Sequence, residues 1–133
     1  MQKIEHIGIA VKSLAMTIPL YEKLLNSNCY KTEMVVSEKV NIAFFKRGET
    51  KIELLESTDP KGTISRFIEN KGEGIHHIAF EVTNIKAEMA RLKQEGFILL
   101  HNKPSVGADN KMICFLHPKT TQGVLIELCQ EIK

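Results

Sequence analysis

The sequence predicts an α+β fold made of two pseudo-symmetric modules, each a β-strand, an α-helix and three further strands. The main observation is an internal repeat, in which the segment that starts at His6 returns at His77, and each half ends in Ile-Glu-Leu. A second observation is that a helical apolar stripe follows each copy at the same offset. Such a repeat sets the architecture and shows which residues recur for a shared structural reason.

Length and patterning predict one domain over residues 1–133, because a chain of this size with 43% hydrophobic residues can bury one core. We assign module 1 to about 1–58, a linker with a short helix to about 59–73, and module 2 to about 74–133.

Module 1 opens with a strand at 4–11 whose apolar residues Ile7, Ile9 and Val11 share one face. Ser13 is a helix cap, and the helix behind it carries the stripe Leu14, Ile18, Tyr21 and Leu25. Strands are expected at 30–36, 40–46 and 51–56, with a hairpin turn at 47–50. The linker predicts a short helix over 63–70.

Module 2 has the same order of elements. We expect a strand at 76–82, Asn84 as the cap of a helix over 85–95, and strands at 97–100, 112–117 and 124–130. Its last turn, at 118–123, is three residues longer than the matching turn of module 1.

Composition excludes several classes of protein. The net charge is +2, and the charges are spread along the chain, so neither a nucleic-acid nor a membrane partner is expected. Polar residues occupy the start of the chain where a secretory signal would be apolar, and no apolar run approaches the ~20 residues of a membrane span. Three cysteines without a CxxC spacing indicate reduced thiols. We therefore expect a cytoplasmic protein.

Strand alternation places His6 and His77 in matching positions, on the face opposite the apolar residues that pack under each helix. Glu53 and Glu127 also match, and each lies between apolar neighbours in a half-buried strand. A lone buried carboxylate is costly, so these four residues predict one shared metal site. The competing interpretation, of packed core histidines and exposed glutamates, fits each residue taken singly but not all four in register.

Two imidazoles and two carboxylates suit a six-coordinate divalent ion with room for water. Co²⁺, Mn²⁺, Ni²⁺ and Fe²⁺ are candidates, and Zn²⁺ can also be held.

At these residues the chain resembles the vicinal oxygen chelate superfamily, and within it the methylmalonyl-CoA epimerase family. The resemblance rests on four segments: Glu5-His6-Ile7-Gly8-Ile9-Ala10-Val11, Glu49 to Glu56, Gly74 to Val82, and Phe115 to Lys119 followed by Gly123 to Leu128. The inter-module segment Ser65 to Gly72 and the His-Pro-Lys turn at 117–119 narrow it to the epimerases.

The resemblance implies a cupped mixed sheet around a divalent metal held by His6, Glu53, His77 and Glu127, with Co²⁺ as the expected ion. It implies an isomerase that interconverts the epimers of methylmalonyl-CoA by removing and returning the proton at carbon 2. Such a reaction needs proton exchange on both faces of a planar intermediate, and we expect Glu127 to be one of the acid/base groups. A homodimer is also expected, to which residues 60–71 contribute.

The second acid/base group is not assigned, because Ile42 stands where some family members carry a glutamate. Glu49, Glu56 and a water molecule are the alternatives. Lys103, Lys111 and Lys119 are candidates to contact the phosphates of the CoA thioester substrate.

Three other functions remain open for the sequence. A glyoxalase I type isomerase would use the same four ligands, a metal-free resistance protein would need a cup without ligands, and a ring-cleaving dioxygenase would carry one carboxylate ligand fewer. The retained His and Glu pairs argue against the metal-free protein.

Overall fold

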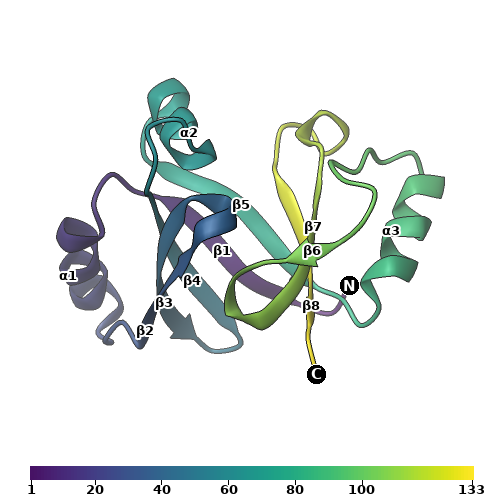
Figure 1. Cartoon of the computed structure of the whole chain (residues 1–133). Coiled ribbons are helices and arrows are strands. Elements are labelled where there is room, and N and C mark those ends of the chain that lie inside the picture. The colour runs from purple at the N-terminus through teal and green to yellow at the C-terminus, as the bar shows by residue number, and fades with distance from the viewer. The chain divides into compact units, whose positions relative to one another are not determined.

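A computed structural model describes all 133 residues of the chain (Figure 1). Eight strands, three α-helices and three short 3₁₀ turns follow one another in the order β1 (Ile4–Ala10), α1 (Leu14–Leu25), β2 (Lys31–Val35), η1 (Val36–Glu38), β3 (Val40–Arg47), β4 (Thr50–Ser57), α2 (Thr63–Lys71), β5 (Gly74–Glu81), α3 (Ile85–Gln94), β6 (Ser105–Val106), η2 (Ala108–Asn110), β7 (Lys111–Leu116), η3 (Pro118–Thr120) and β8 (Ile126–Glu131). The βαβββ order predicted for each module is confirmed.

The strands are hydrogen-bonded in the order β2-β3-β4-β1-β5-β8-β7-β6. The sheet is mixed, because β5 and β8 are parallel whereas β3 and β4, and β7 and β8, are antiparallel. Contacts divide the chain into two compact units, one of residues 7–76 and the other of residues 1–6 together with 77–133. The first six residues thus belong with the second half of the chain.

The core of residues 7–76 lies between α1 and one face of β3 and β4. Its central side chains are Leu14 of α1 and the buried Ala43, Phe45 and Leu54, and the remaining stripe residues of α1 pack against them. The Ser13 hydroxyl accepts a hydrogen bond from the Met16 N–H at 3.2 Å, so the predicted cap is present. Gly48 has φ +59° in the two-residue turn between β3 and β4, a conformation that favours glycine.

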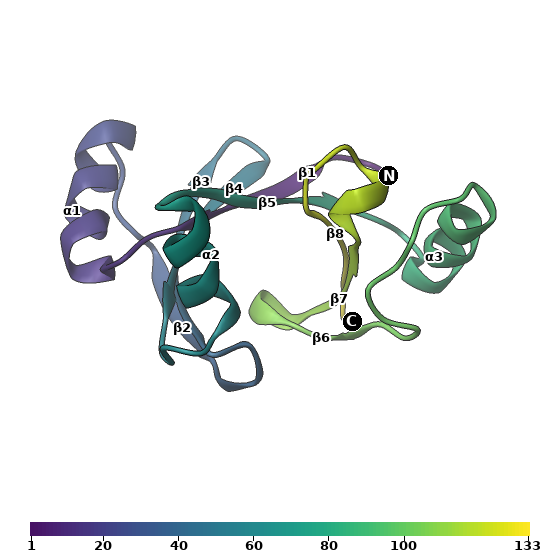
Figure 2. The ribbon, with the colours of Figure 1, turned by 90° about the horizontal axis from the view of Figure 1, so that it is seen from above.

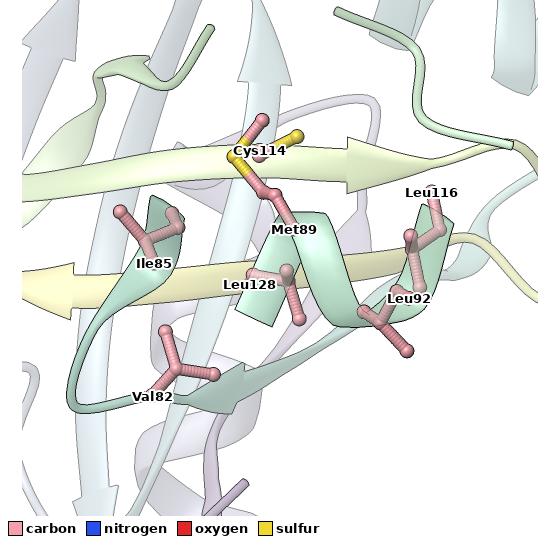
Figure 3. Packing of buried hydrophobic residues seen from close by; sticks show 7 residues of the cluster. All are labelled: Val82, Ile85, Met89, Leu92, Cys114, Leu116 and Leu128. Atoms are coloured by element: carbon pink, nitrogen blue, oxygen red, sulfur yellow. The ribbon is translucent and has the colours of Figure 1, made fainter. Parts of the chain in front are cut away.

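In the other unit, α3 lies on one side of β7 and β8 in both views (Figure 1 and Figure 2). Figure 3 shows the side chains that fill the space between them. They are Val82, Ile85, Met89, Leu92, Cys114, Leu116 and Leu128, all nearly inaccessible to solvent. Asn84 caps α3 as predicted, because its Oδ1 accepts a hydrogen bond from the Ala87 N–H at 3.1 Å. The opposite face of β5, β8 and β7 carries a smaller apolar cluster of Ala79, Ile113, Cys129 and Phe115 beside the polar residues His77 and Glu127.

The prediction of a strand at 97–100 is wrong, because this segment does not form a regular strand. That segment makes a single bridge, Leu99 to Leu116, and the edge of β7 is completed by Ser105 opposite Ile113. Five residues lie between Leu99 and Ser105, whereas two lie between their partners Leu116 and Ile113, so the chain between Leu99 and Ser105 bulges out. Pro104 within the bulge cannot donate a backbone hydrogen bond, which physically interrupts the strand.

No helix is both long and apolar enough to cross a membrane.

The three cysteines predict a simple labelling result. Cys114 and Cys129 are buried, and burial raises the pKa of the Cys114 thiol, whereas Cys29 is half-exposed. A thiol reagent such as DTNB at pH 8 should therefore react rapidly with one thiol in the native protein and with three in denaturant, and Cys29→Ser should remove the rapid phase. Two rapidly reacting thiols in the native protein would contradict this packing.

Candidate metal centre

Strands β5 and β8 bring His77 and Glu127 to the same face. The two strands run parallel, with Ala79 paired to Glu127. Because side chains alternate between faces, His77, two residues before Ala79, lies on the same face as Glu127, opposite α3. On the other flank of β8, Glu127 pairs with Phe115 of β7, whose ring meets the His77 ring edge-on at 5.6 Å. The edge-on contact with Phe115 therefore helps to fix the orientation of the His77 ring.

His6 reaches the same point from β1, the strand hydrogen-bonded to β5. Its Nε2 lies 3.2 Å from Glu127 Oε1, and His77 Nε2 lies 3.0 Å from that same oxygen. The two Nε2 atoms are 3.0 Å apart, with the rings nearly perpendicular. Three of the four predicted ligands therefore converge.

The environment of Glu127 is nearly dry, since His6, His77 and Glu127 are each at most 6% exposed. Burial by itself would raise the pKa of this carboxyl, but hydrogen bonds and charge from His6 and His77 outweigh burial and lower the pKa from 4.5 to about 2. Glu127 is thus a carboxylate at neutral pH.

The donor set fits a divalent ion. His6, His77 and Glu127 each offer one donor atom, and the three atoms lie within 4.8 Å of one another. Two ligands at about 2.1 Å from one ion, in adjacent octahedral positions, are about 3.0 Å apart. The observed separations of 3.0 to 3.2 Å match that spacing, and the mixed N and O donors suit a first-row ion.

Glu5 is a site residue that the sequence analysis did not assign. It is 3% exposed, and its Oε1 lies 2.7 Å from His6 Nδ1, on the side of the ring away from Glu127. The sequence did carry a signal for this role, because Glu5 is a carboxylate directly before the predicted ligand His6 in an otherwise apolar strand.

Lys111 was expected as a candidate for CoA contact, but its ammonium lies 4.0 Å from Glu5 Oε2 and its side chain is only 12% exposed. This placement makes Lys111 a partner of the buried carboxylate. Lys103 is exposed, and Lys119 lies in the turn at 118–120, where its N–H donates to His117 Nδ1 at 3.0 Å.

Glu53 lies in the other unit, on β4, where it pairs with Phe44 of β3. It is 3% exposed, which agrees with the predicted half-buried strand. Its role as the fourth ligand remains a prediction. Ile42 lies on the same face of the sheet as Phe44 and is fully buried, so no acid/base group occupies that position.

His76 points away from the position of His77 and packs edge-on against Phe67 of α2, at 5.0 Å between ring centroids.

The family model of the glyoxalase/bleomycin resistance protein/dioxygenase superfamily matches residues 5–115, which include His6, Glu53 and His77. The chain belongs to this superfamily.

Relatives in the superfamily are similar over nearly the whole chain. The uncharacterized protein YqjC of Bacillus subtilis is 38% identical over 98% of this chain and 93% of its own length. The mitochondrial methylmalonyl-CoA epimerase of Homo sapiens is 35% identical over 96% of this chain and 73% of its own length.

Among solved structures, a variant of Streptomyces coelicolor methylmalonyl-CoA epimerase in complex with 2-nitronate-propionyl-CoA is 32% identical, with a TM-score of 0.94. The match covers 98% of this chain and 95% of that chain. The superfamily fold predicted from the sequence is confirmed.

The lowered pKa of Glu127 predicts how the metal-free protein responds to acid. A carboxyl whose pKa falls on folding stabilises the protein above its unfolded value of 4.5, and this contribution is lost as the pH falls towards 2. Wild type should exceed Glu127→Gln in free energy of unfolding by on the order of 3 kcal/mol at pH 5, and the gap should close by pH 2.

Urea unfolding of chelator-treated protein at several pH values measures this difference. Glu131→Gln, an exposed position on the same strand, is the control and should follow wild type throughout. A gap between wild type and Glu127→Gln that stays constant from pH 5 to pH 2 would argue against the interaction of Glu127 with the two histidines.

Proposed function

We propose that this chain is a methylmalonyl-CoA epimerase, an isomerase acting on a CoA thioester. The observation that carries the proposal is the match to epimerases of that name over nearly the full chain, at 32–36% identity for the human, Cereibacter sphaeroides and Streptomyces coelicolor proteins. The convergence of His6, His77 and Glu127 supports it, because the reaction requires an electrophilic centre beside a carboxylate. The same match favours the epimerase over the glyoxalase I type and metal-free alternatives.

The proposed ligands are His6, His77 and Glu127, with Glu53 as the fourth, and the proposed ion is Co²⁺. A divalent ion bound there would serve as a Lewis acid towards the thioester and carboxylate oxygens of the substrate and so acidify carbon 2, an effect on the order of several kcal/mol. The protein contributes a dry site, and dryness strengthens every charge interaction within it.

Glu127 is the proposed acid/base group on one face of the substrate. Its contacts with His6 and His77 both use Oε1, so its other oxygen is the one available to exchange the proton at carbon 2. A bound divalent ion would keep Glu127 ionised and would also make it a weak base. Proton abstraction by Glu127 therefore requires a substrate whose carbon acid has been strengthened.

For the opposite face, Ile42 has no ionisable group, and we propose Glu49, Glu56 or a water molecule as the second proton carrier. Glu56 also has a structural contact, because its Oε2 accepts a hydrogen bond from the Leu14 N–H at the start of α1, at 3.3 Å.

The remaining parts of the proposal concern binding and assembly. Lys103 and Lys119 are the proposed contacts to the CoA phosphates, Lys111 being paired with Glu5. We propose a cytoplasmic homodimer. Residues 60–71 are one proposed interface, and an exposed apolar row on α1, formed by Met16, Leu20 and Leu24 at helical spacing, is a second, because such rows are commonly covered at interfaces.

The function is tested by following exchange of the carbon 2 proton of methylmalonyl-CoA for deuterium in D₂O by NMR. Co²⁺-loaded protein should exchange the proton and interconvert the epimers, whereas chelator-treated protein should do neither. His77→Ala should lose at least 100-fold in rate, since a first-row ion would lose one of its protein ligands.

The neighbouring substitution His76→Ala is the matched control, because His76 packs on Phe67 outside the metal centre, and it should retain the rate within a few-fold. Absence of exchange by the metal-loaded wild type would refute the substrate assignment. Glutathione hemithioacetal would then be the next substrate to assay.

The dimer is tested by size-exclusion chromatography with light scattering, which should give twice the chain mass of 15.0 kDa. Leu20→Glu should shift the mass towards that of one chain if the α1 row forms the interface. A wild-type mass of 15.0 kDa at micromolar concentration would contradict the dimer.

A further inference from the structure

We propose that Glu5 is a positioning residue of the metal centre, which holds His6 in the tautomer that presents a lone pair at Nε2. The proposal rests on the metal site described under the proposed function, and it assigns a role to a residue outside the predicted ligand set.

The geometry supplies the first argument. Glu5 Oε1 lies 2.7 Å from His6 Nδ1, whereas His6 Nε2 faces Glu127 Oε1 at 3.2 Å. A carboxylate has only acceptor oxygens, so the proton of this bond must be on Nδ1. A neutral His6 with its proton on Nδ1 has its lone pair on Nε2, and Glu127 Oε1 can then accept its hydrogen bond from His77 Nε2, the closer of the two rings at 3.0 Å.

Burial supplies the second argument. Glu5 is 3% exposed, and a buried carboxylate is costly unless it is paired and hydrogen-bonded. The Lys111 ammonium is 4.0 Å from Glu5 Oε2, beyond hydrogen-bond length, so His6 is a closer partner than Lys111. A short N–H···O⁻ bond of 2.7 Å is in the range of charge-assisted hydrogen bonds. The strand therefore keeps a buried charge in close contact with a ligand ring.

The chemistry of metal-bound imidazole explains why such a contact is useful. A histidine ligand commonly donates its second ring N–H to a carboxylate, which fixes the ring and raises its basicity, and loss of that partner commonly costs 10–100-fold in metal affinity. His77 is oriented differently, by its edge-on contact with Phe115. Only one of the two histidines therefore depends on Glu5.

The proposal is tested first by Co²⁺ affinity, measured by competition with a chelator. Glu5→Leu should weaken binding by about 10–100-fold, whereas Glu5→Gln, whose amide oxygen can still accept the bond, should weaken it less. Glu81→Gln is the matched control, because Glu81 is also 4.0 Å from a lysine, Lys3, but does not touch a ligand. It should bind Co²⁺ as wild type does.

The second measurement is the histidine tautomer, from long-range ¹H–¹⁵N NMR of the metal-free protein at pH 9. Wild type should show His6 protonated at Nδ1, Glu5→Gln should keep this tautomer, and Glu5→Leu should populate protonation at Nε2. A purely structural role would lower the melting temperature without changing the tautomer. A wild-type His6 protonated at Nε2, or Glu5→Leu binding Co²⁺ within twofold of wild type, would overturn the proposal.

These outcomes are separable from failure of the proposed function. The tautomer is read without metal or substrate, so it reports on Glu5 even if the wild type fails to epimerise methylmalonyl-CoA. If the wild type binds Co²⁺ and Glu5→Leu does not, the positioning role stands whatever the substrate.

Discussion

The burial of the Glu127 carboxylate beside two imidazoles is the constraint on which the rest of the structure depends. A carboxylate at this depth is tolerated only with close hydrogen-bond partners or a cation. His6 and His77 lie close enough to Glu127 to be its hydrogen-bond partners, and they are also placed to bind a metal ion together with it. This requires β1, β5 and β8 to be neighbours in the sheet, as they are. The helix on the opposite face and the aromatic ring of Phe115 then exclude water and hold the donors in register.

The internal repeat distributes the four predicted ligands evenly, two to each module, whereas the structure gathers three of them in one compact unit. The difference arises because residues 1–6 leave the first module and pair with β5, through backbone hydrogen bonds from Gln2 N–H to Glu81 O and from Glu81 N–H to Lys3 O, both 2.9 Å. The modules defined by the sequence repeat therefore differ from the units defined by contacts in where they place residues 1–6. Local sequence patterns cannot reveal such pairing of the first residues with a distant strand, since strand pairing joins residues far apart in the chain.

Much of the fold could be predicted because its signals are local. Alternation, helical stripes and the caps Ser13 and Asn84 each depend on a few neighbouring residues, and all were confirmed. The strand at 97–100 failed because apolar content suggested pairing, whereas the bulge through Pro104 breaks the ladder with β7. Glu5 was missed because alternation assigns consecutive strand residues to opposite faces, and only the three-dimensional structure shows its side chain reaching back to His6.

The placement of the first six residues has a consequence for the order of events during synthesis. His6 is synthesised well before the strands that complete its unit, β5 and β8. Until these strands emerge, residues 1–6 have no partner within their own unit, and contacts of such long sequence separation form late. The metal centre is accordingly expected to be among the last parts of the nascent protein to assemble, so an ion would be captured after the two cores have formed.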